Sequence, residues 1–109
     1  MPRLETKTLH FLPRHLEMLL DLIQKHLPQA EVWAYGSRVN GDCHDASDLD
    51  LVARNRINLA DPVPELFAFK DALVESDLPI RVEVVDWARI PEAFRREIER
   101  EYVVIWPLR

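Results

Sequence analysis

Apolar residues along this chain alternate between helical and strand spacing, and this alternation limits the possible fold more than any other feature. Leucines and an isoleucine recur at helical intervals from Pro13 to Leu27, and Pro28 ends the pattern. Short apolar runs typical of strands then alternate with two more helical stretches. The predicted elements are a helix over 13–27, strands over 31–35 and 48–53, a helix over 61–76, a strand over 80–85, a helix over 91–101 and a strand over 103–106. This order predicts an α/β (α+β) fold with a small mixed sheet flanked by helices.

Length and charge narrow the class of protein. A chain of 109 residues predicts a single domain over residues 1–109. The formal net charge of −5 gives no electrostatic reason to bind a nucleic-acid backbone, so we expect no direct nucleic-acid binding. Cys43 is the one cysteine, which excludes an intrachain disulfide, and no apolar run has membrane-spanning length. The N-terminus lacks the apolar region of a signal peptide, so we expect a cytoplasmic protein without membrane contact.

Both glycines of the chain, Gly36 and Gly41, lie in one segment, which indicates a turn with special backbone geometry. Gly36 and Ser37 follow the predicted strand 31–35. A short helix beginning at Arg38 leaves backbone N–H groups and the Ser37 hydroxyl free at this turn, and free amides and the helix dipole both favour phosphate. Gly36, Ser37 and Arg38 are therefore candidate phosphate-binding residues. The alternatives are a plain capped turn and an ordinary helix-start arginine.

An acidic pair follows. Asp48 and Asp50 alternate with Leu49 and Leu51, and residues two apart on a strand share a face at about 6.5–7 Å. Two carboxylates on one face repel each other unless a cation lies between them. Mg²⁺ commonly binds one or two carboxylates together with substrate phosphates. The pair therefore predicts a metal site, and an exposed acidic strand face is the alternative.

A third carboxylate is expected on a neighbouring strand. Glu83 lies between Val82 and Val84, where an apolar residue is ordinary. It is our candidate for the general base or for a ligand of a second metal, and a solvent-facing strand residue is the alternative. Asp86, three residues on and on the opposite strand face, is the second candidate.

The spacing of these residues carries a family resemblance. Gly36-Ser37, ten intervening residues and then Asp48-Leu49-Asp50 form the pattern G-S-x10-D-x-D. In this respect the chain resembles the DNA-polymerase-β-like nucleotidyltransferase superfamily. Its short length and the strand Arg-Val-Glu-Val-Val-Asp resemble the minimal nucleotidyltransferase (MNT) group, over about residues 12 to 106. The resemblance implies the minimal nucleotidyltransferase fold, ATP as substrate and Mg²⁺ in a two-metal site.

By position, the resemblance also implies residue roles. Gly36 and Ser37 hold the triphosphate, Asp48 and Asp50 bind the metals, and Glu83 is the third carboxylate. Aspartate is commoner in the family at this third position. Glutamate is one methylene longer, which leaves the geometry at Glu83 open.

The function implied by the resemblance involves a second protein. MNT proteins are commonly the antitoxin halves of HEPN/MNT toxin–antitoxin pairs. The resemblance implies transfer of AMP from ATP to a hydroxyl, in the best case a tyrosine, of a cognate HEPN ribonuclease toxin. The alternatives are an antitoxin that acts by binding alone and a nucleotidyltransferase for a small-molecule hydroxyl. Assembly as a homo-oligomer, or as a hetero-oligomer with the toxin, is left open.

Overall fold

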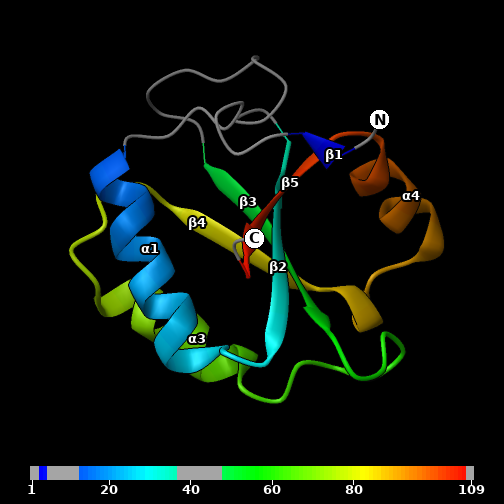
Figure 1. Cartoon of the computed structure of the whole chain (residues 1–109), viewed down its shortest axis with the longest axis horizontal. Helices are drawn as coiled ribbons and strands as arrows, with labels where there is room; N and C mark the ends of the chain where they lie inside the picture. The colour runs from blue at the N-terminus through cyan, green and yellow to red at the C-terminus, as the bar shows by residue number, and fades with distance from the viewer. Residues whose placement is uncertain (1–2, 5–12, 37–47, 108–109) are drawn as a thin grey trace.

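The computed structural model describes residues 3–4, 13–36 and 48–107 of the chain (Figure 1). Its elements follow the predicted order, with an additional strand near the N-terminus and an additional short 3-10 helix after β4. They are β1 (Arg3–Leu4), α1 (Pro13–His26), β2 (Ala30–Tyr35), β3 (Leu49–Asn55), α3 (Leu66–Glu75), β4 (Val82–Asp86), the 3-10 helix η2 (Trp87–Arg89), α4 (Glu92–Arg100) and β5 (Tyr102–Trp106). The short helix predicted to begin at Arg38 lies outside the described residues.

The strands form one mixed sheet, which confirms the predicted fold class. The strand order is β1-β5-β2-β3-β4. The central strand β2 pairs antiparallel with both β3 and β5, while β3–β4 and β1–β5 are parallel pairs. Helix α3 connects β3 to its parallel neighbour β4, as a parallel pair requires.

Each face of the sheet has its own apolar core. Helices α1 and α3 cover one face and α4 lies on the other side (Figure 1). In β3, Leu49, Leu51 and Ala53 belong to the larger cluster under α1 and α3, whereas Val52 belongs to a smaller cluster with Ile98 of α4. Strand residues alternate between faces, so the even-numbered residues of β3 project toward the α4 side. This alternation decides which acidic side chains lie on the same face of the sheet.

The predicted start of the helix over 61–76 was wrong, because α3 begins at Leu66. Pro64 disfavours the helical conformation at Val63. The Val63 N–H instead donates to Asp86 Oδ2 at 3.0 Å, and Leu66 N–H reaches back to Val63 O at 3.4 Å. Residues 61–63 are therefore held outside the helix.

Among the residues that the structure describes, no helix combines the length and the apolar character needed to cross a bilayer.

Candidate active site

Three side chains lie in a row across β2, β3 and β4. Tyr35 is the Cα partner of Asp50 in the antiparallel pair, and Asp50 is the Cα partner of Glu83 in the parallel pair. Directly paired residues share a face, so all three project toward the α4 side of the sheet. The structure thus brings together two of the predicted acids, Asp50 and Glu83, and adds a phenol that the sequence analysis did not single out.

Gly36 closes one side of this row. Its φ is +83°, in the left-handed region that favours glycine. A Cβ built at this position would lie 2.6 Å from Asp50 Oδ2, closer than atoms can approach. Glycine is therefore required here by the Asp50 carboxylate as well as by the backbone. The special backbone geometry was predicted from the sequence, and the contact with Asp50 was not.

The acids interact unfavourably with one another. Burial raises the pKa of Asp50 above its ordinary value, and the charges of Asp48 and Glu83 raise it further. Asp48 is half-buried and lies immediately before β3. Carboxylate oxygens are ligands that hard divalent ions prefer, and a cation placed among them would relieve this repulsion.

The described residues do not yet enclose such an ion. No group of three or more His, Cys, Asp or Glu side chains among them has a geometry that could hold a metal. Ser37 and Arg38, the other two predicted phosphate contacts, lie outside the described residues.

Tyr35 stays protonated beside the acids. Burial raises the pKa of its phenol to about 12, and the charges of Asp50 and Glu83 act in the same direction. Its ring packs edge-on against Phe94 of α4, with ring centroids 5.8 Å apart. The phenol is therefore a neutral hydrogen-bond donor at the margin of an anionic site. The sequence does contain a sign of this placement. Tyr35 lies two residues after Trp33 on the same strand, so the two side chains share a face of the sheet.

Glu83 has a cationic partner that the sequence analysis also missed. Arg81 Nη2 lies 2.6 Å from Glu83 Oε1, and the two side chains are 74% and 48% exposed. Residues two apart on one strand share a face, so Arg81 lies beside Glu83 on the end strand of the sheet. The half-exposed Glu83 carboxylate is accessible to a substrate from solvent.

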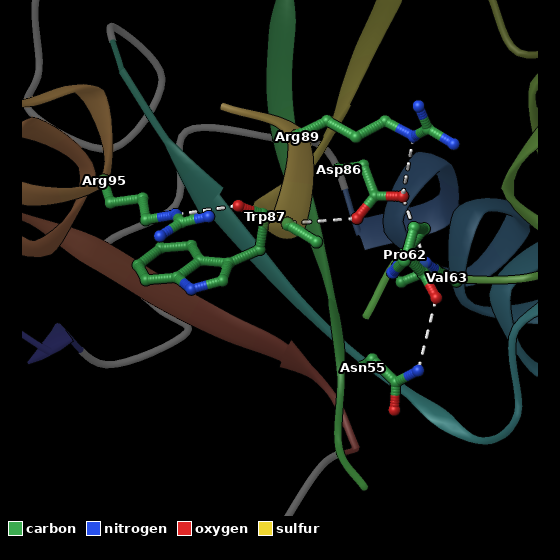
Figure 2. Close-up of polar contacts among 8 residues, drawn as sticks. Asn55, Pro62, Val63, Asp86, Trp87, Arg89 and Arg95 are labelled. Carbon is green, nitrogen blue, oxygen red and sulfur yellow. Dashed lines mark hydrogen bonds and ion pairs between the residues drawn. The ribbon is translucent and has the colours of Figure 1, made fainter. Parts of the chain in front are cut away.

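Asp86, the second candidate for the third carboxylate, lies elsewhere. It belongs to the opposite face of β4, as its parity predicted, and is 6% exposed. Its carboxylate accepts from Val63 N–H at 3.0 Å and from Ala88 N–H at 3.2 Å, and Arg89 Nε lies 3.9 Å away. Figure 2 shows Asp86 between Val63 and Arg89. These contacts cap η2 and fix the chain before α3, which is a structural task.

Aromatic and cationic side chains pack behind the acids on the same face. Trp33 stacks on Tyr102 with centroids 3.9 Å apart, and the guanidinium carbon of Arg54 lies 4.0 Å from the centre of the Trp33 ring. Arg54 is ion-paired with Glu31, and Arg95 Nε donates to the Trp87 carbonyl at 2.8 Å (Figure 2). These contacts support the row of site residues without belonging to it.

Comparison with known proteins identifies the family and the fold of this chain. The model of the Nucleotidyltransferase domain family matches residues 16–105. The probable protein adenylyltransferase MntA of Haemophilus influenzae is 42% identical over 92 residues, which cover 83% of this chain and 77% of that protein. Two solved structures have the same fold and cover 86% of this chain and 74% of their own. They are a toxin–antitoxin crystal structure with AMP-PNP (TM-score 0.66, 16% identity) and a mutant of the toxin–antitoxin MntA-HpeT (TM-score 0.65, 14% identity).

The family match extends from within α1 to within β5 and therefore includes the whole row of site residues. The relative from Haemophilus influenzae is similar over most of the same span. By both measures, this chain belongs to the nucleotidyltransferase domain family and is a nucleotidyltransferase.

Proposed function

We propose that this protein transfers AMP from ATP, with Mg²⁺, to a hydroxyl of a partner protein, in a single domain over residues 1–109. In this reaction the acceptor oxygen forms a bond to the α-phosphorus of ATP, the bond from that phosphorus to the bridging oxygen breaks, and pyrophosphate leaves. The acceptor proton passes to a base. The observation that carries the proposal is the placement of Asp50 between Tyr35 and Glu83, where burial and the charges of Asp48 and Glu83 raise its pKa.

The three acids have different roles in this proposal. Asp48 and Asp50 are the metal ligands, and Glu83 is the third carboxylate. When bound, the metal ions neutralise charge on the phosphates and on the attacking and leaving oxygens. Glu83 is half-exposed at the end of the row, where it can accept the proton of an incoming hydroxyl. Gly36, Ser37 and Arg38 hold the triphosphate at the turn after β2.

The acceptor is a second protein. The similar protein from Haemophilus influenzae is named as a probable protein adenylyltransferase, and both similar structures are of toxin–antitoxin complexes. We therefore propose a cognate HEPN ribonuclease toxin as partner and a tyrosine of that toxin as acceptor. Modification of the tyrosine neutralises the toxin.

The test uses ATP labelled in either the α- or the γ-phosphate. The protein is incubated with each label, Mg²⁺ and a candidate HEPN partner protein. Label from the α-phosphate should appear on the partner and label from the γ-phosphate should not. Asp48→Asn and Asp50→Asn should lose transfer, and Glu83→Gln should slow it by roughly 10²–10⁴-fold. Asp21→Asn, at an exposed acid of α1 on the opposite side of the sheet, is the matched control.

The same variants separate catalysis from binding alone. If Asp50→Asn neutralises the toxin as well as the unchanged protein does, the protein acts by covering the toxin. If label moves only to a small-molecule hydroxyl, the protein acceptor is wrong and the transferase assignment remains.

A further inference from the structure

Strand β4 forms one end of the sheet. Among the strands that the structure describes it pairs with β3 alone, and Figure 1 shows it at the rim of the sheet. The Arg81 carbonyl accepts from Leu49 N–H at 2.9 Å and therefore points toward β3. Backbone groups of successive strand residues point in opposite directions, so the N–H and C=O groups of Val82 and Val84 point away from the sheet. They offer a row of donors and acceptors to a further strand.

Two hollows follow this edge. The first, of about 470 Å³, lies between the strand residues Arg81 to Val84 and the C-terminal half of α3. The second, of about 490 Å³, continues along Val84, Val85 and Asp86 beside the N-terminal half of α3. Both are lined by Lys70 and Val84, so they form one groove along the whole of β4, which we call the β4 groove.

The outer wall of the β4 groove is apolar and exposed. Phe67 and Val74 line its two halves and are 77% and 84% exposed, respectively. With Lys70 between them, they follow one stripe of α3 at helical spacing. Lys70 has no ion pair among the described residues, so the groove carries a free cation at its centre.

The β4 groove and the acid row share Glu83, which lines the first hollow and is the Cα partner of Asp50. A strand added beside β4 directs alternate side chains to opposite faces of the sheet. One set would lie against Phe67 and Val74. The other set would project to the face of Glu83 and Asp50, where the acceptor hydroxyl is needed.

We propose that the acceptor protein docks an extended segment on the edge of β4, so that the sheet gains a strand. The inference rests on the proposed function, because it assigns the surface that presents the acceptor. The segment carries apolar residues on both sides of the hydroxyl-bearing residue, and an acidic side chain that pairs with Lys70. Main-chain hydrogen bonds supply the affinity and the apolar wall supplies the selectivity.

The first test follows backbone amides and needs no catalysis. Hydrogen exchange is measured by NMR on the free protein and on its complex with the HEPN partner. The amides of Val82 and Val84 should exchange at least about tenfold more slowly in the complex, because a new strand protects them. Unchanged exchange at both amides in a formed complex overturns the proposal, as does failure to form any complex.

The second test separates docking from chemistry. Val82→Pro removes one outward donor, and Val82→Thr keeps it with a similar branched side chain. The proline variant should raise the KM for the protein acceptor by roughly tenfold, the effect of about one main-chain hydrogen bond. The KM for ATP should not change. Urea unfolding of both variants checks that the strand still folds.

Phe67→Asp and Lys70→Glu should also raise the KM for the protein acceptor. The control is Ile57→Asp, which changes an exposed apolar residue away from the β4 groove and should leave this KM unchanged. If all variants transfer AMP with the unchanged acceptor KM, the docking surface is wrong and the transferase proposal stands. If the unchanged protein transfers no label, while the two amides are protected in the complex, the transferase proposal fails and the docking surface stands.

Discussion

Gly36 and Asp50 occupy adjoining space at the end of β2, and neither can change without affecting the other. The glycine has a left-handed backbone, and the space where its side chain would lie is filled by the Asp50 carboxylate. The sequence predicted that this glycine is special. It could not predict the reason, because the contact depends on the pairing of two strands separated by the long segment 37–47.

Replacement of this glycine should reveal the contact. We expect Gly36→Ala to lower the free energy of unfolding by about 1–2 kcal/mol, since alanine disfavours positive φ and its Cβ meets Asp50 Oδ2. In an Asp50→Ala background the cost should fall, because the clashing oxygen is gone. A double-mutant cycle by urea unfolding measures this coupling. Strict additivity would show that Asp50 does not occupy the space.

Removal of the Asp50 charge should stabilise the fold, because this carboxylate is partly buried and is repelled by Asp48 and Glu83. Its pKa is raised in the folded state, so its contribution to stability is present in acid and is lost as pH rises through that raised value. At pH 7 without metal, Asp50→Asn should raise the Tm by about 2–4 °C, after allowance for solvent screening. The gain should vanish below the ordinary pKa of an aspartate. Asp21→Asn, scanned in parallel, should leave the Tm unchanged.

At the scale of the elements, η2 and the segment before α3 are joined by one buried carboxylate. Asp86 accepts from Val63 and Ala88, and the Asn55 side chain donates to the Pro62 carbonyl at 3.2 Å nearby (Figure 2). The helix over 61–76 was predicted from a local cap and proline signal. The actual start depends on this contact with β4, which no local pattern reveals.

We expect Asp86→Ala to lower the free energy of unfolding by about 2–4 kcal/mol, because two backbone donors lose a charged acceptor. The KM for ATP should stay unchanged, since Asp86 is on the face away from Asp50. Chemical denaturation and nucleotide titration measure the two quantities separately. A large change in ATP affinity at constant stability would return Asp86 to the active site.

For the whole molecule, local periodicity predicted most helices and strands but not how they pair. The mixed sheet followed from the order of elements, and strands over 31–35 and 48–53 agree with β2 and β3 within two residues. Strand β1 was missed, because two residues gain strand structure only through pairing with β5. Tyr35 was missed as a site neighbour because its nearness to Asp50 depends on the register of β2 and β3. Arg81 could have been predicted, because it lies two residues from Glu83 in the same predicted strand.

Ligand binding should stabilise the whole fold. With Mg²⁺ and a non-hydrolysable ATP analogue at about 100 times the dissociation constant, the free energy of unfolding should rise by about 2.7 kcal/mol. The acids then face a cation instead of one another. EDTA should abolish the metal-dependent part of the gain, and Asp50→Asn should show none of it. Thermal scans of the two proteins at matched ligand concentration make the comparison.

The separate apolar core on the α4 side has an optical consequence. Trp33 and Trp87 belong to this smaller cluster, with ring centroids 5.4 Å apart, whereas Trp106 packs against the larger one. Trp33 lies two residues from Tyr35 on the same strand face. In a Trp106→Phe protein, the fluorescence of Trp33 and Trp87 should therefore change when a ligand binds near the acids. Nucleotide titrations can then be followed without an attached dye.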